Sequence, residues 1–404
     1  MKRPRVLVVG GGFAGLSCAN GLDSRRFEVT LIDRKRHFEF LPNIHELLSG
    51  VKRPAQLRLP LNACMQALGH RFHCAAVERI DLAARTVWLS RHQQLPADYL
   101  LIALGAEDAT YGVAGVAENA LGFKSVRQCQ AIRQRLQELA RGSGPKRVVL
   151  IGGGLEGVEA LGEILRRYRH RGLSIQLVEA QSRLLGSHPP AVADFIAGHC
   201  REQGVALLLG DPVSRITAKT VYLGSGRRLR SELTIWTGGP APQALLADGT
   251  IAAAGQWVSV TKNLAVPEHE RVFVAGDAST PQASISKQAY HAMDMGSCVA
   301  ENISRLARGR RPKVYRPSAK PTVLAFGDLS TVLIAGRRAV AGPALATAKE
   351  GIFVAVMTQL DQRPLGSRLP AVFDRGREAT QQLLWPMLSS LKELQRQSNL
   401  QHLS

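Results

Sequence analysis

The pattern of apolar and polar positions at the start of the chain predicts a strand, a helix and a second strand. An apolar run at residues 6–9 meets three consecutive glycines, a segment of helical character follows, and a second apolar run at 27–32 ends on Asp33. This order, closed by an acidic residue, is the complete βαβ pattern of a dinucleotide-binding fold. The start of the chain therefore predicts a dinucleotide site.

Each glycine of this stretch has a place in such a site. Gly10 permits the tight turn, Gly12 lets the backbone approach a pyrophosphate, and Gly15 lets the helix pack closely on the strand. The N-terminus of the helix then faces the phosphates. Asp33 is placed to accept hydrogen bonds from a ribose.

The same pattern returns in residues 146–179. A strand is expected at 148–151, a helix at 155–168, and a second strand at 174–178 that is followed by Glu179. The glycines of this second pattern are Gly152, Gly154 and Gly157. Two complete patterns in one chain predict two dinucleotide sites.

Acidic residues of the second pattern bear on which nucleotide binds. Glu179 is expected to accept from both hydroxyls of the adenosine ribose and to repel a 2′-phosphate, which favours NADH over NADPH. Arg183 is close in sequence and could instead hold such a phosphate, so NADPH stays an alternative. Glu159, just inside the predicted helix, is the acid that could reach the reacting rings. Its alternative is an ordinary acid favoured by the helix dipole.

Other apolar runs extend the expected sheets. Those at 98–105 and 233–239 end on glycine, and the run at 271–277 passes through Gly276 to Asp277. Ligands bind at the C-terminal ends of strands in doubly wound sheets, so we expect Asp277 to contact a ribityl chain. The alternative is a turn aspartate.

The segment between the two patterns is less regular. Residues 57–68 are predicted to form a helix, and 72–80 and 86–90 to form antiparallel strands. His45 stands beside apolar residues. Two interpretations of it stay open: a packed imidazole, and a catalytic acid or base.

Composition adds an unusual charge. Lys and Arg total 52 against 32 acidic residues, a net charge of +20, which favours anionic partners. The 6 cysteines form no CxxC pair, which indicates reduced, cytosolic thiols. No uninterrupted apolar run is long enough to span a membrane, and no metal site is expected.

These motifs together resemble a known family, the flavoproteins with two dinucleotide-binding domains. Within them the chain is most similar to the group of type II NADH dehydrogenases, sulfide:quinone reductases and ferroptosis suppressors. The motifs that carry the resemblance are Gly10-Gly11-Gly12-Phe13-Ala14-Gly15 with Asp33, Ala103-Leu104-Gly105, Gly152 to Glu159, Trp236-Thr237-Gly238-Gly239 and Gly276-Asp277.

The resemblance implies an α/β fold with two Rossmann-like domains. An FAD domain would comprise residues 1–112 and 248–318, an NAD(P)H domain at 113–247 would be inserted into it, and 319–404 would form a small α+β C-terminal region. A hydride would pass from NADH to FAD, and the flavin would then reduce a second substrate. The residues expected at the two cofactors are Gly10, Gly12, Phe13, Ala14, Gly15, Asp33, Arg34, Gly105, Gly276, Asp277, Gly152, Gly154, Gly157, Glu179 and Gly238.

Departures from the family pattern lie after Asp277. Type II dehydrogenases carry AQxAxQ near the quinone, whereas residues 289–294 read AYHAMD, without either glutamine. Lys287 resembles the sulfide:quinone branch, where a lysine lies beside the flavin's pyrimidine end, and it joins Glu159 as a catalytic candidate. That branch needs a C-terminal cysteine, and none follows Cys298, so sulfide oxidation is not expected.

The expected activity is an FAD-dependent NAD(P)H oxidoreductase with a quinone or similar lipophilic acceptor. One alternative is a soluble reductase of a small acidic electron-transfer protein. Another is a flavoprotein that acts mainly as a binding or signalling module. Basic residues do not interleave with aromatic ones as in base-stacking proteins, so no specific nucleic acid is expected.

The C-terminal part predicts short strands at 322–326 and 330–335 and a helix at 379–394 with leucines at helical spacing. That helix could lie at a membrane interface, form a dimer face or pack on its own domain. The basic segment 305–316 could touch anionic lipid. We expect a cytoplasmic protein, with a peripheral place on the inner face of the membrane and a homodimer left open.

Overall fold

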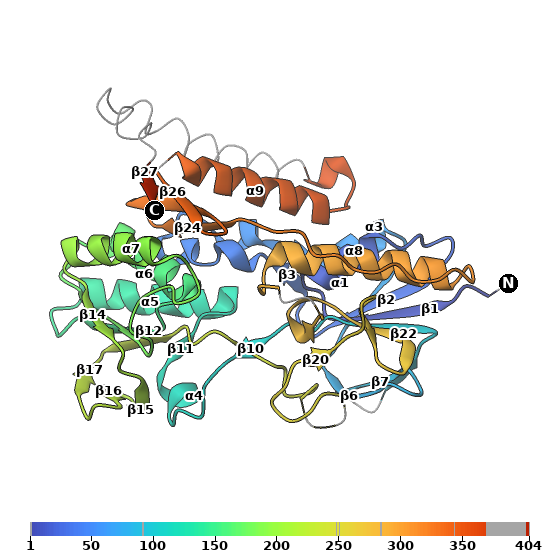
Figure 1. The fold of residues 1–404 in the computed structure, drawn as a ribbon, viewed down its shortest axis with the longest axis horizontal. Helices are drawn as coiled ribbons and strands as arrows, with labels where there is room; N and C mark the ends of the chain where they lie inside the picture. Colours follow the sequence, from blue (N-terminus) through green and yellow to red (C-terminus); the bar gives the residue numbers. More distant parts are fainter. Residues whose placement is uncertain are drawn as a thin grey trace.

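The computed structural model describes residues 2–90, 93–247, 249, 251–282, 285–342, 344–368 and 401–403 of the chain. Two largely parallel sheets form the body, with helices packed against them (Figure 1). This is the α/β architecture with two Rossmann-like units that the repeated pattern predicts. The helix expected at 379–394 lies outside the described residues.

The first sheet is built around the first glycine-rich pattern. Its order is β21-β22-β9-β1-β2-β5, and all neighbours run parallel except β21 against β22. The strands are β1 (Arg5–Val9), β2 (Glu28–Asp33), β5 (Arg71–Cys74), β9 (Tyr99–Ile102), β21 (Ala265–Val266) and β22 (His269–Val274). The chain thus leaves this sheet after β9 and returns to it with β21.

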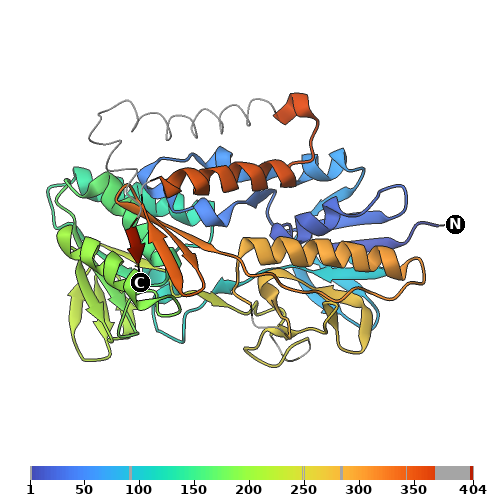
Figure 2. The same ribbon diagram turned by 45° about the horizontal axis from the view of Figure 1, so that its top comes forward.

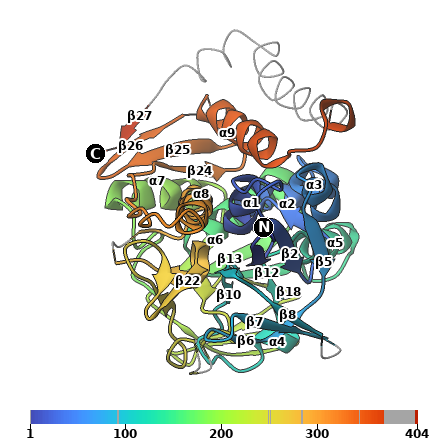
Figure 3. The ribbon, with the colours of Figure 1, turned by 90° about the vertical axis from the view of Figure 1, so that its right-hand side faces the viewer.

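Two helices pack side by side on the first sheet, α1 (Phe13–Asn20) and α8 (Ala289–Leu306), as the end-on view shows (Figure 3). Their approach is close because Gly296 faces the backbone of Ala14. A Cβ atom at Gly296 would lie 2.1 Å from the carbonyl oxygen of Ala14.

The second sheet repeats the arrangement around the second pattern. Its order is β11-β18-β12-β13-β14, with all neighbours parallel. The elements are β11 (Leu121–Gly122), β12 (Arg147–Ile151), β13 (Ser174–Glu179), β14 (Ala206–Leu209), β18 (Leu233–Trp236), α5 (Val126–Arg141), α6 (Leu155–Tyr168) and α7 (Pro190–Glu202). Where the chain crosses between the sheets, β10 (Glu107–Asp108) pairs antiparallel with β19 (Pro240–Ala241).

Small sheets, one of them parallel and the others antiparallel, and short helices complete the two units. They are β6 (Val77–Asp81), β7 (Thr86–Leu89) and β8 (Gln94–Pro96); β15 (Val213–Thr217), β16 (Thr220–Leu223) and β17 (Arg228–Arg230); β3 (His37–Glu39) with β4 (Arg58–Pro60); β20 (Val258–Ser259) with β23 (Ser279–Thr280); and the helices α2 (Glu46–Ser49), α3 (Leu61–Ala67) and α4 (Val116–Asn119).

The C-terminal region forms a layer over both units (Figure 2). An antiparallel sheet contains β24 (Thr322–Phe326), β25 (Ser330–Ala335), β26 (Arg338–Ala341) and β27 (Gln401–Leu403), and the helix α9 (Leu345–Leu360) follows β26. This layer touches the second unit where Gly162 of α6 meets Gly327: a Cβ atom at Gly162 would lie 2.5 Å from the backbone nitrogen of Gly327.

Most predicted elements occur where expected, and two predictions are wrong. Residues 57–68 are not one helix, because Leu57, Leu59 and Leu61 alternate with more exposed residues and the strand β4 precedes α3. Residues 72–80 are not one antiparallel strand. Instead β5 joins the first sheet parallel to β2, and only β6 pairs antiparallel with β7.

Candidate functional site

The first glycine-rich loop joins β1 to α1 at the C-terminal edge of the first sheet. Gly10 has φ +106°, in the region that favours glycine, and a Cβ atom there would lie 2.3 Å from the Ala103 oxygen. A Cβ atom at Gly15 would lie 1.9 Å from the Gly10 oxygen, so only glycine lets the helix begin so close. At Gly12 a Cβ atom would meet nothing within 4 Å. The backbone at Gly12 is therefore open to a ligand.

Asp33 closes this loop from the end of β2. Its Oδ2 accepts a hydrogen bond from the Gly11 amide at 2.7 Å, and its Oδ1 accepts from the Lys35 amide at 2.7 Å. These bonds hold the carboxylate beside the loop. The side chain of Arg34, which follows, is exposed.

The second loop, between β12 and α6, is built in the same way. Gly152 has φ +105°, a Cβ atom at Gly157 would lie 1.9 Å from the Gly152 oxygen, and Gly154 is open within 4 Å. Glu179 takes the place of Asp33: its Oε2 accepts from the Gly153 amide at 2.6 Å. The two loops are thus equivalent in geometry.

The guanidinium of Arg183 is not free to bind a ligand beside Glu179, because it already donates to backbone carbonyl oxygens. Its Nη1 donates to the carbonyl oxygens of Leu185 at 3.3 Å and His188 at 2.9 Å, and its Nη2 donates to that of Gly186 at 2.5 Å. Arg183 therefore ties down the loop after β13.

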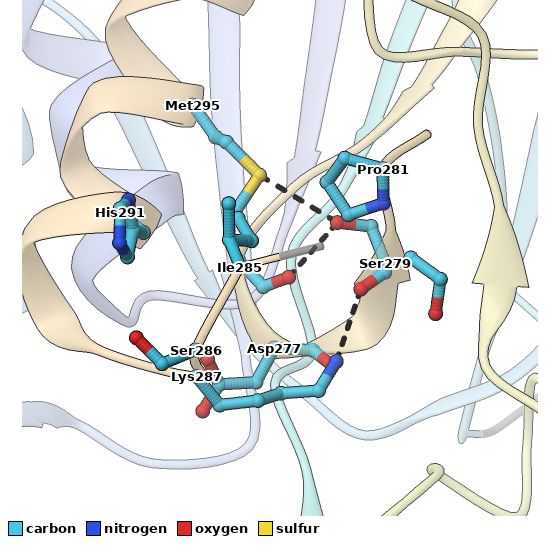
Figure 4. A pocket seen from close by; sticks show the side chains of 10 residues that line it. Asp277, Ser279, Pro281, Ile285, Ser286, Lys287, His291 and Met295 are labelled. Atoms are coloured by element: carbon cyan, nitrogen blue, oxygen red, sulfur yellow. Dashed lines mark hydrogen bonds between the residues drawn. The ribbon is translucent and has the colours of Figure 1, made fainter. Parts of the chain in front are cut away.

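Asp277 and Lys287 line a cavity of about 210 Å³ at the edge of the first sheet (Figure 4). The Lys287 ammonium donates to the carbonyl oxygens of Asp277 at 2.7 Å and Ser279 at 3.0 Å, and it lies 3.6 Å from the centre of the Trp257 ring. Lys287 thus fixes the turn that presents Asp277. Burial lowers the pKa of Lys287 and raises the pKa of Asp277.

The Asp277 carboxylate makes no hydrogen bond or ion pair to any of the residues that the structure describes. Beside it in the same cavity, the buried His291 has an Nδ1 atom without a hydrogen-bond partner in the described part of the chain. The cavity is therefore lined by a carboxylate without a hydrogen-bond partner among the described residues.

The other expected cofactor residues lie at the same edges. Phe13 stacks edge-to-face on Phe38 and Phe40, with ring centres 4.9 Å and 5.5 Å apart, so it belongs to an aromatic cluster. Gly105 and Gly276 both have φ +72° at the ends of β9 and β22. Gly238 follows β18, where a Cβ atom would lie 2.6 Å from the Trp236 indole nitrogen. Ala14 is buried near Gly276.

Glu159 lies in a buried charged cluster that joins three parts of the chain. Its Oε1 accepts from the Lys349 ammonium of α9 at 2.5 Å and from the Ala325 amide of β24 at 3.1 Å. Its Oε2 is 3.5 Å from His45 Nδ1, just before α2. Burial raises the pKa of Glu159, and Lys349 opposes that rise.

His45 is the neutral member of this cluster. Burial, Lys349 and Lys52 all lower its pKa, well below the usual value. Its Nε2 lies 3.2 Å from the Lys349 ammonium, which can only donate, so we assign the ring proton to Nδ1, facing Glu159. A proton can therefore be held between the Glu159 carboxylate and the imidazole.

A second buried pair lies beside the first. Lys52 is fully buried, and its ammonium lies 2.8 Å from both carboxylate oxygens of Glu350. Farther along α6, the buried Glu163 accepts a short hydrogen bond from Ser49, and burial raises the pKa of Glu163 to about 7.

The two catalytic candidates are not brought together: no hydrogen bond or ion pair joins Glu159 to Lys287 within the part of the chain that is described. Sequence reasoning missed Lys349 and left His45 undecided. A signal was present for Lys349, because Lys349 and Glu350 are the only charged residues between Arg338 and Asp361.

Comparison with known proteins shows which family and which relatives this chain is similar to. The family model described as pyridine nucleotide-disulphide oxidoreductase matches residues 4–296. The chain is 26% identical to the demethylphylloquinone reductase NdbB of Synechocystis, over 87% of this chain and 92% of that protein. It is also 26% identical to the type II NADH:quinone oxidoreductase Ndh of Mycobacterium tuberculosis, over 78% of this chain and 75% of that protein.

Solved structures agree in fold. NDH2 of Plasmodium falciparum, solved in complex with NADH, superposes with a TM-score of 0.84 at 14% identity, covering 95% of this chain and 99% of that one. The sulfide:quinone oxidoreductase of Aquifex aeolicus superposes with a TM-score of 0.76 at 20% identity, over 90% and 94% of the two chains. At these identities the likeness establishes the α/β fold.

Among the described residues, no helix combines the length and the apolar character needed to cross a bilayer.

Proposed function

Because the chain belongs to the pyridine nucleotide-disulphide oxidoreductase family, we propose that it is an FAD-containing NADH:quinone oxidoreductase. The observation that carries the proposal is the pair of equivalent open loops, each closed by a carboxylate, Asp33 in one and Glu179 in the other. Two relatives named as quinone reductases match most of the chain, which supports the choice of acceptor.

The first site fits FAD. Gly12 leaves room for a pyrophosphate at the N-terminus of α1, Asp33 can accept from a ribose, and the Asp277 carboxylate is available to a ribityl hydroxyl. Bound FAD would supply the redox chemistry, taking up a hydride and giving electrons to the acceptor. The protein itself would bind and orient the cofactor and supply protons. Lys287 contributes by holding the Asp277 turn.

The second site fits NADH better than NADPH. Glu179 is held at the end of β13 by the backbone amides of Gly153 and Gln181, which place its carboxylate beside the second glycine-rich loop, where a ribose would bind. A 2′-phosphate there would meet this carboxylate, and the guanidinium of Arg183 already donates to three carbonyl oxygens.

Reduction of a quinone consumes protons as well as electrons, and the Glu159 cluster can supply them. Glu159 holds a raised pKa through burial, and His45 carries a proton on Nδ1 that faces it. When Glu159 has given up its proton, the Lys349 ammonium stabilises the negative charge of its carboxylate. We assign Glu159 the role of proton donor to the acceptor, with His45 and Lys349 as its partners.

The domain limits and the place of the enzyme at a membrane are also part of this proposal. We propose the domain limits 1–112 with 248–318 for the FAD domain, 113–247 for the NADH domain and 319–404 for the C-terminal region. Because a quinone is lipid-soluble, the enzyme would act peripherally at a membrane. Arg308, Arg310 and Arg311 are exposed in the basic segment and would each add about 1 kcal/mol of attraction to anionic lipid.

A small acidic electron-transfer protein is the second candidate acceptor, favoured by the net charge of +20. Steady-state NADH oxidation by the purified yellow protein separates the two, with a short-chain quinone in one assay and an acidic ferredoxin in the other. Turnover with the quinone supports the proposal. Turnover with the ferredoxin alone would replace it, and absence of FAD in the heat-released extract would exclude both.

A further inference from the structure

Lys124 stands at the edge of the second sheet where the second glycine-rich loop lies. It follows β11, whose Gly122 pairs with Trp236 of β18, and Trp236 also pairs with Ile151 at the end of β12. Parallel strands that are paired in this way end at a common edge, so Lys124 and the loop after β12 share that edge. Lys124 is therefore placed beside the candidate NADH site.

The ammonium of Lys124 meets an acidic residue at the start of α6. Its Nζ donates to the two carboxylate oxygens of Glu156 at 2.7 Å and 2.9 Å, and Glu156 is in the first turn of that helix. The helix dipole favours a carboxylate there, but the same carboxylate would repel a diphosphate, and the ammonium offsets that repulsion. The ion pair thus borders the open space at Gly154 that a dinucleotide would occupy.

Local hydrogen bonds fix the backbone of Lys124. Its amide donates to Gln128 Oε1 at 2.9 Å, and the Gln128 amide donates to Ser125 Oγ at 3.2 Å, which caps α5. The amide of Val126 donates to Glu39 Oε2 of the first unit at 3.4 Å. The start of α5 is therefore tied to the first unit, and it holds Lys124 in place.

The same ion pair is within electrostatic range of the first cofactor site. Burial raises the pKa of Asp277, and Lys287 lowers it. Lys124 also lowers this pKa, whereas Glu156 raises it. Lys124 acts in the same sense on Asp108 of β10, the strand that crosses between the two sheets (Figure 1). Because such charge effects fade over about 10 Å, the pair of Lys124 and Glu156 lies close both to Asp277 and to the second glycine-rich loop.

We propose that Glu156 and Lys124 bind the carboxamide of the nicotinamide ring of NADH: Glu156 accepts from its amino group, and Lys124 donates to its carbonyl oxygen. The inference rests on the proposed function and deepens it, because it names the residues that hold the reacting half of NADH. The adenosine half is assigned to Glu179.

The chemistry of the pair matches a carboxamide. A primary amide presents an amino donor and a carbonyl acceptor side by side, and a carboxylate next to an ammonium complements both. The hydrogen bonds between Lys124 and Glu156 use two of the three N–H groups of the ammonium in the described part of the chain, and they leave the carboxylate further lone pairs. Both groups can therefore bind the ligand while they keep their own contact. A carboxamide held at both ends fixes the rotation of the ring, as hydride transfer requires.

The competing role for this pair is structural: it could only tie α6 to the start of α5. The Glu156 side chain is 44% exposed, and exposed ion pairs contribute little to stability. Variants of the pair should therefore fold, and ligand binding is the measurement that separates the two roles.

The first test is Glu156→Met in the flavin-loaded full chain, with equilibrium binding measured by calorimetry. NAD⁺ is compared with its acetylpyridine analogue, in which a methyl group replaces the amino group of the carboxamide. We expect the unaltered protein to bind NAD⁺ about tenfold more tightly than the analogue, and Glu156→Met to bind the two equally. Glu156→Gln keeps an oxygen acceptor and should keep the preference. The matched control is Glu138→Met, because Glu138 is 46% exposed and pairs with Arg135 at 2.6 Å.

The second test is Lys124→Met, with two ligands that share the diphosphate. Tetrahydro-NAD carries the carboxamide on a neutral ring that cannot give up a hydride, whereas ADP-ribose lacks the ring. A changed charge beside the diphosphate affects both ligands alike, so we expect Lys124→Met to weaken tetrahydro-NAD about tenfold more than ADP-ribose. Lys124→Arg keeps the donors and should bind both ligands nearly normally. Lys313→Met, which removes the partner of Glu301 at 3.0 Å, is the control and should change neither affinity.

The ligand series separates this inference from the proposed function. An equal loss of tetrahydro-NAD and ADP-ribose in Lys124→Met, or a preference for NAD⁺ that survives in Glu156→Met, would overturn the carboxamide assignment. An unaltered protein that binds NAD⁺ and the acetylpyridine analogue equally would overturn it as well. If the unaltered protein reduces no quinone, the proposed function fails, while the same ligand series still decides the role of the pair.

Discussion

Glu159 Oε1 and Lys349 Nζ lie 2.5 Å apart, although 190 residues separate them in the chain. The pair joins α6, at the second dinucleotide loop, to α9 of the C-terminal layer. This contact makes the C-terminal region part of the candidate site, and it brings a cation and a carboxylate together in the cluster to which we assign proton donation.

Replacing the carboxylate of this pair tests proton donation. Glu159→Gln should lower turnover with quinone about 10²-fold or more, because the general acid is lost. Flavin bleaching by NADH should stay near the normal rate, since hydride transfer needs no proton from this side chain. Stopped-flow bleaching and steady-state quinone reduction measure the two steps separately. A loss confined to bleaching would contradict the role given to Glu159.

Nucleotide choice should depend on Glu179. Glu179→Ser removes the carboxylate to which we assign the ribose contact and the repulsion of a 2′-phosphate, so kcat/KM for NADH should fall about tenfold while that for NADPH rises. Arg183→Ala is the control, because Arg183 binds only carbonyl oxygens in its described contacts. The preference for NADH should survive in Arg183→Ala, and a switch toward or away from NADPH there would show that Arg183 reads the phosphate.

Two glycines of the second loop should behave in opposite ways. Gly154 has ordinary φ and open space around a Cβ atom, so Gly154→Ala should leave the unfolding temperature almost unchanged and weaken NADH binding. Gly157→Ala would place a Cβ atom 1.9 Å from the Gly152 oxygen. That clash should destabilise the fold by about 1–3 kcal/mol. Thermal unfolding and NADH titration of both variants check the contrast.

The buried Glu163 makes stability depend on pH. Burial raises the pKa of Glu163 to about 7 in the folded protein, above its ordinary value of 4.5. Between these two values the folded protein holds a proton that the unfolded chain has lost. The free energy of unfolding should therefore fall as pH rises through this window, by up to about 3 kcal/mol.

Glu163→Gln should remove that slope, and the exposed Glu202→Gln should leave it intact. Urea unfolding at several pH values between 5 and 8 measures both variants. An unchanged slope in Glu163→Gln would mean that another group titrates in this window.

The parts of the site that sequence alone predicts are local in the chain. The helix at 155–168 coincides with α6, and the glycines and acids of both βαβ patterns stand within one strand–helix–strand unit, where a tight turn dictates the residue type. At residues 57–68 the spacing of apolar residues led to a wrong prediction. A strand of three residues precedes a helix there, so neither the period of a strand nor that of a helix runs through the whole segment.

The charged cluster could not be predicted in this way. The contacts of Glu159 with His45 and Lys349 depend on how α2, α6 and α9 pack, and no short-range pattern encodes that packing. The sequence held one indication, a Lys-Glu pair within an otherwise uncharged helix. Charged residues on such a helix are costly to bury unless each has a partner, and the structure gives both of them partners.

The transfer of electrons from NADH to a quinone is tested by a two-step anaerobic mixing experiment on the purified yellow protein, followed by flavin absorbance. NADH is added first, and a short-chain quinone is added after the absorbance has settled. We expect rapid bleaching by NADH and full recovery when the quinone arrives. Absence of bleaching, or a bleached flavin that the quinone cannot reoxidise, would contradict it.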